Sequence, residues 1–276
     1  MKKYDENRAF ALLDKIGFTR VAGSSEELKA AKILKAECES FGLSAVIEPF
    51  EIESAEVEAT FEILEPYRKS YTVRGYQCAE STAADGLTAD FVYVENALPV
   101  DLLNVKGKIV LVNGFLRVPL YRSLMEAGAA AVVTMDGDIH DDLENTDLHQ
   151  RKLRSALRTF GNAPAVQLRT VDAMEIVNKG ASRAKVTVQN KNITLTSHNV
   201  IAVIKGTEHP EQIISFGAHY DSVEFSKGVY DNGAGSVINM EAARWFAQHP
   251  PKRTVKAARR LDSRAVRHSC ATTRMS

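Results

Sequence analysis

The chain has 276 residues, 45% of them hydrophobic, which is enough for one large domain or two smaller ones with a substantial core. Its 35 lysines and arginines balance 35 aspartates and glutamates, so the charge gives no reason to expect a nucleic acid or an anionic membrane as a partner. The three cysteines, Cys38, Cys78 and Cys270, are far apart and form no C-x-x-C pair, which excludes a cysteine-rich zinc module and fits a reducing compartment.

The N-terminal residues show no sign of a targeting or membrane segment. Residues 1–6 are mostly charged and no apolar stretch follows them, so we expect no signal peptide. No window approaches the roughly 20 apolar residues that a membrane-spanning helix needs. We therefore expect a soluble, cytoplasmic protein.

Two helices are predicted near the N-terminus. The first covers residues 6–16. Its apolar face is formed by Phe10, Leu13 and Ile16. After a loop, Ser24 or Ser25 is placed to cap a second helix that ends at Gly42. Cys38 lies on the apolar face of this helix, which favours a core position over a reactive thiol.

Residues 44–64 are expected to form strands, with an interruption at Pro49. From Val57 to Ile63, apolar residues alternate with glutamates and a threonine. A strict period of two predicts a half-exposed antiparallel strand. The glutamates are therefore interpreted as a solvated face and not as an acid–base pair.

An inserted domain is predicted over residues 85–188. Strands at residues 90–94 and 107–112 precede a helix at residues 119–127 and a strand at residues 129–134. The runs Gly107-Lys108-Ile109-Val110-Leu111-Val112 and Ala129-Ala130-Ala131-Val132-Val133, with a helix between them, resemble a protease-associated domain. That resemblance implies an α+β module without chemistry of its own.

The polar residues after this strand suggest a metal site at first sight. They are His140, Asp141, Asp142, Asp147 and His149. Since no rigid apolar element holds them, we interpret residues 136–158 as a surface loop. A strand at residues 163–168 and a helix that Thr170 caps and Gly180 ends follow, with strands at residues 185–188 and 193–195 leading out of the insert.

Two apolar strands are predicted after the insert. Residues 199–204 form an almost continuous apolar run, which is typical of a strand buried on both faces of a parallel sheet. The next strand carries Ile213, Ile214 and Phe216, and we expect it to be buried too. It leads to the position at which open α/β sheets place their ligands.

Two short motifs follow: Gly217-Ala218-His219-Tyr220-Asp221-Ser222, and Tyr230-Asp231-Asn232-Gly233-Ala234-Gly235. His219 and Asp221 are two residues apart, so on an extended chain their side chains point the same way. A lone histidine at a strand end is commonly a hydrogen-bonded structural residue. The helix after the second motif has an apolar stripe that places Trp245 in the core. The stripe consists of Val237, Ile238, Ala242, Trp245 and Phe246.

The complete pattern of strand, His-x-Asp, loop, Asp-Asn-Gly-x-Gly and helix resembles the zinc-dependent, di-zinc aminopeptidase family that includes aminopeptidase S and aminopeptidase Y. Members of this family carry a protease-associated domain as an insert. The resemblance implies that His219 and Asp231 are metal ligands, with Asp231 bridging two zinc ions, and that Asp221 is the catalytic-site residue that orients the imidazole. Two zinc ions would activate a shared water and hold the peptide.

The resemblance also calls for a glutamate base, a glutamate ligand, and a further aspartate and histidine after the next strand. No glutamate follows Glu241, no apolar run after Val255 is suited to a central strand, and only His268 could replace a ligand. We interpret the arginine-rich segment 256–276 as the result of a frameshift or truncation near Thr254, with the catalytic C-terminal part missing. We expect this chain alone to be inactive.

The predicted fold is α/β, a zinc-exopeptidase-like, mostly parallel sheet with flanking helices and an inserted protease-associated domain. The predicted domains are residues 1–84 and 189–255 of the peptidase, the insert at residues 85–188, and the tail. The predicted function is release of N-terminal amino acids from peptides, and the alternative is a non-catalytic peptide- or partner-binding protein. A carboxypeptidase-type member, the substrate side chain and the oligomeric state stay open. A dinucleotide site lacks its third glycine, and no Gly-x-Ser-x-Gly elbow supports a serine hydrolase.

Overall fold

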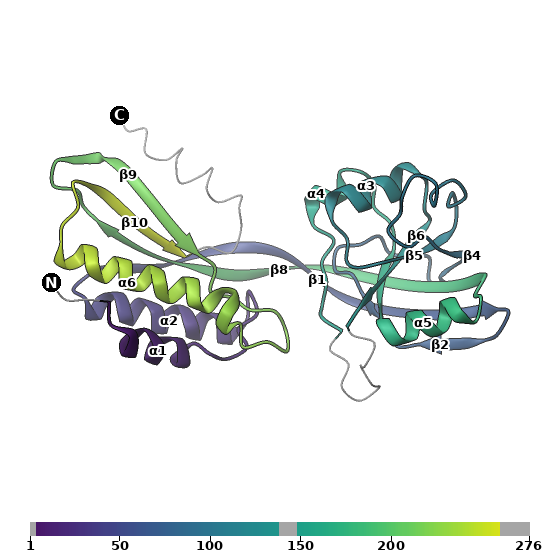
Figure 1. The fold of residues 1–276 in the computed structure, drawn as a ribbon, viewed down its shortest axis with the longest axis horizontal. Helices are drawn as coiled ribbons and strands as arrows, with labels where there is room; N and C mark the ends of the chain where they lie inside the picture. The colour runs from purple at the N-terminus through teal and green to yellow at the C-terminus, as the bar shows by residue number, and fades with distance from the viewer. Residues whose placement is uncertain (1–3, 138–147, 260–276) are drawn as a thin grey trace. The chain divides into compact units, whose positions relative to one another are not determined.

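The computed structural model describes residues 4–137 and 148–259 (Figure 1). The chain divides into two compact units. The first contains the residues up to Ile52 and those from Leu195 onward, and the second contains residues 53–194. No helix in the described ranges is long and apolar enough to cross a membrane.

The first unit packs helices against one face of a small sheet (Figure 1). Its helices are α1 (Glu6–Lys15), α2 (Ser25–Ser40) and α6 (Gly235–Gln248), with the irregular turn η1 (Val229–Ala234) before α6. Its strands are β9 (His209–Ala218), β10 (Arg253–Arg259) and the adjoining parts of β1 (Ala45–Glu65) and β8 (Arg183–Ile204). Strand β10 lies between its neighbours, antiparallel to β8 and parallel to β9.

The two N-terminal helices form where the sequence predicts them, but the buried face of α1 differs from the predicted one. The Ser24 hydroxyl accepts a hydrogen bond from the Glu27 N–H at 3.1 Å, which confirms the predicted cap of α2. Cys38 is buried in the core, also as predicted. The prediction for Phe10 is wrong because α1 turns Ala9, Leu12 and Ile16 inward, and Phe10 is 65% exposed.

Strand β1 is continuous over 21 residues, so the predicted break at Pro49 is wrong. Proline lacks an N–H, but a strand tolerates it where no ladder hydrogen bond is needed from that residue. The pairing of β1 with β2 (Lys69–Tyr71) covers Phe61 to Ile63 and does not reach Pro49, while β8 adjoins β1 on its other side. The predicted alternation is confirmed, since Phe61 and Ile63 are buried whereas Glu56 and Glu58 are exposed.

The later strands are less buried than their apolar sequences suggest. Strand β8 joins the three segments predicted at residues 185–204, and Val203 is 54% exposed, so burial on both faces is wrong there. Burial of β9 is also wrong, since Ile213 and Ile214 are about half exposed. In the described part of the chain β9 pairs only with β10, so it is an edge strand.

Two further predictions for this unit are wrong. Helix α6 buries Val237, Met240 and Ala243, which leaves Trp245 36% exposed and stacked on His249 at a ring distance of 3.8 Å. Strand β10 continues past Val255 to Arg259, although this segment lacks an apolar run. Main-chain hydrogen bonds to β8 and β9 on both sides hold it, and they do not depend on side-chain type.

The second unit is built around four parallel strands, in the order β4 (Leu87–Tyr93), β5 (Ile109–Val112), β6 (Ala131–Asp136) and β7 (Ala165–Arg169). Strand β3 (Arg74–Gly75) pairs with β7, and β8 pairs antiparallel with β4 on the other side. The unit also contains β2, the second part of β1, and helices α3 (Val118–Glu126), α4 (Ser155–Arg158) and α5 (Thr170–Asn178). Two apolar clusters form its core. The predicted α/β class with parallel strands and flanking helices is confirmed, and the protease-associated insert at residues 85–188 stays a prediction.

The prediction that Thr170 caps α5 is wrong, because Thr170 is already the first residue of the helix. Arg169 occupies the cap position, and the Thr170 hydroxyl donates instead to the Asp136 carbonyl at 3.1 Å. This bond links α5 to the end of β6.

Candidate metal centre

His219 follows the last residue of β9, and its ring is held from one side by Asp221. The distance from His219 Nδ1 to Asp221 Oδ1 is 3.0 Å. A carboxylate on one ring nitrogen keeps the proton there and leaves the other nitrogen as a lone-pair donor, which is the usual support for a metal-binding histidine. The Ser236 hydroxyl donates to the His219 carbonyl at 3.1 Å, so the start of α6 also fixes this residue.

Asp231 lies on the other side of the same ring. Its Oδ1 is 3.0 Å from His219 Nε2, and its side chain is 81% exposed. Asp231 has extended backbone angles of φ −116° and ψ 98° within the turn η1, and its peptide bond to Asn232 is cis. The structure therefore brings together all three residues that the sequence singles out.

The spacing of the two donor atoms suits a metal ion. Nitrogen and oxygen ligands about 2.0–2.1 Å from a tetrahedral zinc are about 3.3 Å apart, close to the distance between His219 Nε2 and Asp231 Oδ1. Both side chains are open to solvent. Their donor set of imidazole nitrogen and carboxylate oxygen is one that zinc accepts.

The electrostatics of the pair favour a protonated ring when no metal is bound. The hydrogen bond to Asp221 raises the pKa of His219, and the charges of Asp221 and Asp231 act the same way, while burial opposes them. Because a metal ligand must be neutral imidazole, a metal at this position competes with a proton.

The remaining acidic and histidine candidates do not complete this centre. Within residues 4–137 and 148–259, no group of three or more histidines, cysteines, aspartates or glutamates is arranged to hold a metal. His149 lies 3.6 Å from Asp136 in the second unit. His140, Asp141, Asp142, Asp147 and His268 lie outside the described residues.

Sequence reasoning missed a buried polar layer beside the pair. The carboxylate of Glu27 is fully buried and accepts hydrogen bonds from the Tyr220 hydroxyl and from His198, at 3.0 Å from its Nδ1. Arg20, also fully buried, bonds to the chain on both sides of Asp221 and Ser222. The only sequence signal for Glu27 was its place in the first turn of α2, where a carboxylate suits the helix dipole anyway.

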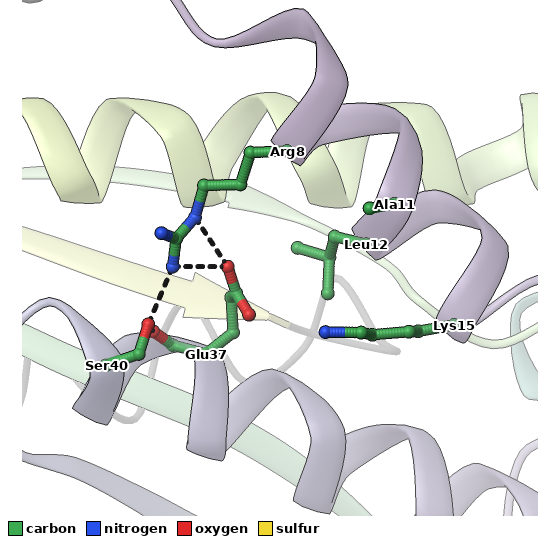
Figure 2. Close-up of a pocket in the computed structure, with 6 residues that line it drawn as sticks. All are labelled: Arg8, Ala11, Leu12, Lys15, Glu37 and Ser40. Carbon is green, nitrogen blue, oxygen red and sulfur yellow. Dashed lines mark hydrogen bonds and ion pairs between the residues drawn. The ribbon is translucent and has the colours of Figure 1, made fainter.

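A separate hollow of about 330 Å³, whose lining includes neither His219 nor Asp231, lies between α1 and α2 (Figure 2). Its lining residues are Arg8, Ala11, Leu12, Lys15, Glu37 and Ser40. Arg8 spans it, with Nε 2.8 Å from a Glu37 oxygen and Nη2 2.7 Å from the Ser40 hydroxyl. Arg8, Glu37 and Ser40 are thus bonded to one another, and the hollow has the character of a helix–helix groove.

Comparison with known proteins finds similarity in the segment that contains His219 and Asp231. Residues 199–259 match the model of Peptidase family M28. Human carboxypeptidase Q is 27% identical over 275 residues, covering 91% of this chain and 57% of the relative. The chain thus spans little more than half the length of this relative and of carboxypeptidase Q from Xenopus laevis.

Solved structures agree on the fold. An aminopeptidase from Aneurinibacillus sp. strain AM-1 has a TM-score of 0.63 and 25% identity, covering 92% of this chain and 62% of the other. A zinc aminopeptidase from Bacillus subtilis has a TM-score of 0.68 and 23% identity, covering 93% and 61%. The resemblance to zinc-dependent aminopeptidases is therefore confirmed.

Proposed function

Because this chain is a relative of the zinc aminopeptidases of Peptidase family M28, we propose that its His219 and Asp231 hold zinc for the hydrolysis of peptides. The observation that carries the proposal is the pair of opposed contacts on one imidazole. Asp221 lies at Nδ1 and Asp231 at Nε2, each at 3.0 Å. A structural histidine needs only one hydrogen-bond partner. A metal site needs a second ligand atom beside the ring nitrogen that carries the lone pair, so that both can bind the same ion.

Each residue has a separate task in this proposal. Asp221 keeps the proton on Nδ1, so His219 presents the Nε2 lone pair. Asp231 adds a carboxylate whose two oxygens are able to serve two ions, the number that the resemblance implies. Zinc bound there supplies Lewis-acid chemistry, since it lowers the pKa of a bound water and polarises a carbonyl.

The type of exopeptidase remains part of the proposal. The relatives include proteins named carboxypeptidase Q and proteins named aminopeptidase, so their names do not decide which end of a peptide is cut. We propose the aminopeptidase, with a peptide as the substrate and no nucleic acid or membrane as a partner. A cytoplasmic location also stays a proposal, supported by the two buried free thiols of Cys38 and Cys78.

The test is a calorimetric zinc titration of the chain at pH 7.5, followed by assays with an aminoacyl p-nitroanilide and its N-acetylated form. We expect zinc binding that weakens at least tenfold in His219→Ala and in Asp231→Asn. His209→Ala is the matched control, because His209 is an exposed histidine at the start of β9 in the same unit.

Two results would contradict the proposal. Equal zinc affinity in His219→Ala and His209→Ala would remove His219 from the site. Measurable hydrolysis of the N-acetylated substrate, at a rate equal to that of the free amine, would exclude an aminopeptidase. The expectation that this chain alone is inactive is checked by the same assay, because turnover of the free amine that zinc restores after chelation would refute it.

A further inference from the structure

Arg20 is the largest of the fully buried side chains, and it has an unusual set of partners. In the described part of the chain, every hydrogen bond recorded for its guanidinium goes to a main-chain carbonyl oxygen. The acceptors belong to Ile16, Phe18, Tyr220, Lys227 and Gly228. A buried charge is normally paired with a carboxylate, whereas these bonds go to the main chain. We therefore interpret Arg20 as a residue that joins segments of the main chain through the fixed geometry of its guanidinium.

The carbonyls form two groups that lie far apart in the sequence. Nη1 donates to the Ile16 carbonyl at 2.8 Å and to the Phe18 carbonyl at 2.9 Å, which anchors the side chain at the end of α1. Nε donates to the Tyr220 carbonyl, Nη1 also to that of Lys227, and Nη2 to that of Gly228 at 2.9 Å. One rigid fork therefore links α1 to both ends of loop 220–228.

The main chain of Arg20 strengthens the same link. Its N–H donates to the Ser222 hydroxyl at 3.0 Å, and its carbonyl accepts from the Ser222 N–H at 3.1 Å. Together with the guanidinium bonds, these contacts fix the loop directly before and after Asp221. Loop 220–228 is the segment that separates His219 from Asp231.

Two glycines leave the space that the guanidinium occupies. A Cβ on Gly228 would lie 3.3 Å from Nη2 of Arg20 and 2.6 Å from the Ser222 Cβ. A Cβ on Gly233 would lie 3.2 Å from the same nitrogen and 2.9 Å from the Gly228 carbonyl. The turn that presents Asp231 is thus packed against the guanidinium, not merely near it.

Arg20 also interacts with Asp221 through its charge. Burial lowers the pKa of Arg20, and the charge of Asp221 acts to raise it. The Asp221 carboxylate is thus close enough to act on the guanidinium, in agreement with the bonds that Arg20 makes on both sides of Asp221.

We propose that Arg20 is a positioning residue that holds loop 220–228 in place, so that His219 and Asp231 are spaced for a metal ion before one binds. This inference rests on the proposed function for its consequence, which is tight zinc binding. Metal ligands that are already in position bind more tightly, because none of the binding free energy is lost in ordering the loop. Arg20 itself contacts neither donor atom in this arrangement.

The first experiment compares zinc affinity in Arg20→Lys and Arg20→Met with that in Arg244→Lys and Arg244→Met. Arg244 is the matched control, since it is a buried arginine of the same unit whose guanidinium bonds to Glu241 on its own helix. We expect at least a tenfold loss of affinity in Arg20→Met, a smaller loss in Arg20→Lys, and less than a twofold change in either Arg244 variant. Cobalt substitution adds a spectrum, because a displaced ligand shifts the visible absorption bands of the metal.

Equal losses in the Arg20 and Arg244 variants would overturn the proposal, since a general loss of stability would then explain both. A second measurement needs no metal. Amide hydrogen exchange in the zinc-free chain should show at least tenfold protection at Ser222 and Gly233, whose N–H groups donate to the main-chain carbonyls of Arg20 and Gly228, and this protection should be lost in Arg20→Met and kept in Arg244→Met. Protection that appears only after zinc is added would refute preorganisation. If the unaltered chain binds no zinc, the proposed function fails, and the exchange measurement alone then decides the role of Arg20.

Discussion

Replacing Glu27 with alanine tests whether the buried layer beside the metal pair stabilises the first unit. The Glu27 carboxylate accepts from the main-chain N–H of His198 at 3.3 Å, from its ring Nδ1 at 3.0 Å, and from the Tyr220 hydroxyl. Tyr220 has a second acceptor, the His198 carbonyl at 2.7 Å, so it loses less than His198 does.

The loss of unfolding free energy expected for Glu27→Ala comes from the hydrogen-bond donors that are left without an acceptor. A buried donor that loses its partner costs about 1–3 kcal/mol, and two such donors on His198 give about 2–6 kcal/mol. Because the His198 side chain is 15% exposed, water reaches part of it, and we expect the lower half of that range, about 2–4 kcal/mol. Glu27→Gln keeps one acceptor oxygen and the volume, so about 1–2 kcal/mol is expected.

Urea unfolding followed by the fluorescence of Trp245, the only tryptophan, reports on the unit that contains Glu27. The control is Glu37→Ala, which removes a partly exposed ion pair with Arg8 and should cost at most about 1 kcal/mol. If Glu27→Ala costs no more than Glu37→Ala, the buried layer does not stabilise the unit in the way proposed.

Three further outcomes are expected. Phe61→Ala, at a position 1% exposed in the core of the second unit, should cost about 3–5 kcal/mol in urea unfolding, and a cost near that of an exposed site would contradict the packing. Cys38 and Cys78 should react with a thiol reagent at least tenfold more slowly in the native chain than in urea, as followed by mass spectrometry of the labelled peptides. Burial acts to raise the pKa of Asp136, but the hydrogen bond and charge of Arg151 outweigh it and the pKa is lowered, so Asp136→Asn should lower stability at pH 7, and the loss should shrink as the pH falls below the ordinary aspartate pKa of 3.8 and through the lowered folded-state pKa. A loss that stays the same as the pH falls would show that the ion pair with Arg151 is not its source.

The group formed by His219, Asp221 and Asp231 was accessible to sequence reasoning because its members are close together along the chain. The spacing of two residues predicts that His219 and Asp221 point the same way, and the resemblance of the two motifs to di-zinc aminopeptidases implied that Asp231 joins them. Arg20 and Glu27 act on the same segment from about 200 positions away. No local pattern records such a contact, and both residues look like ordinary loop and helix positions in the sequence.

The burial errors have a related cause. Ile213 and Ile214 have the composition of a buried strand, but they point to opposite faces of the sheet on its edge strand β9, and both are about half exposed there. Trp245 was placed in the core because it is large and apolar, whereas the angular position of α6 is set by smaller residues such as Val237 and Ala243. Local composition predicts which elements form, and the identity of their neighbours decides how deeply each side is buried.

The titration of His219 in the zinc-free chain gives a final prediction. The hydrogen bond to Asp221 and the charges of Asp221 and Asp231 raise its pKa above the ordinary value of 6.5. A folded-state pKa above the unfolded value means that the folded state binds this proton more tightly, so the contribution to stability is fully present below the unfolded pKa. That contribution is lost as the pH rises through the folded pKa.

Proton NMR of the His219 ring in the presence of a chelator should therefore show a pKa above 6.5, and Asp221→Asn should lower it, because the largest cause of the shift is removed. His209→Ala serves to assign the signals, since it removes another histidine of this unit. The bond to Asp221 that raises this pKa also holds the ring in the orientation proposed for a metal ligand. Asp221→Asn should therefore change both the ring pKa and the zinc affinity: protons compete less with zinc, but the ring is held less firmly. A ring pKa at or below 6.5 in the unaltered chain would show that Asp221 and Asp231 do not hold the imidazole from both sides in solution.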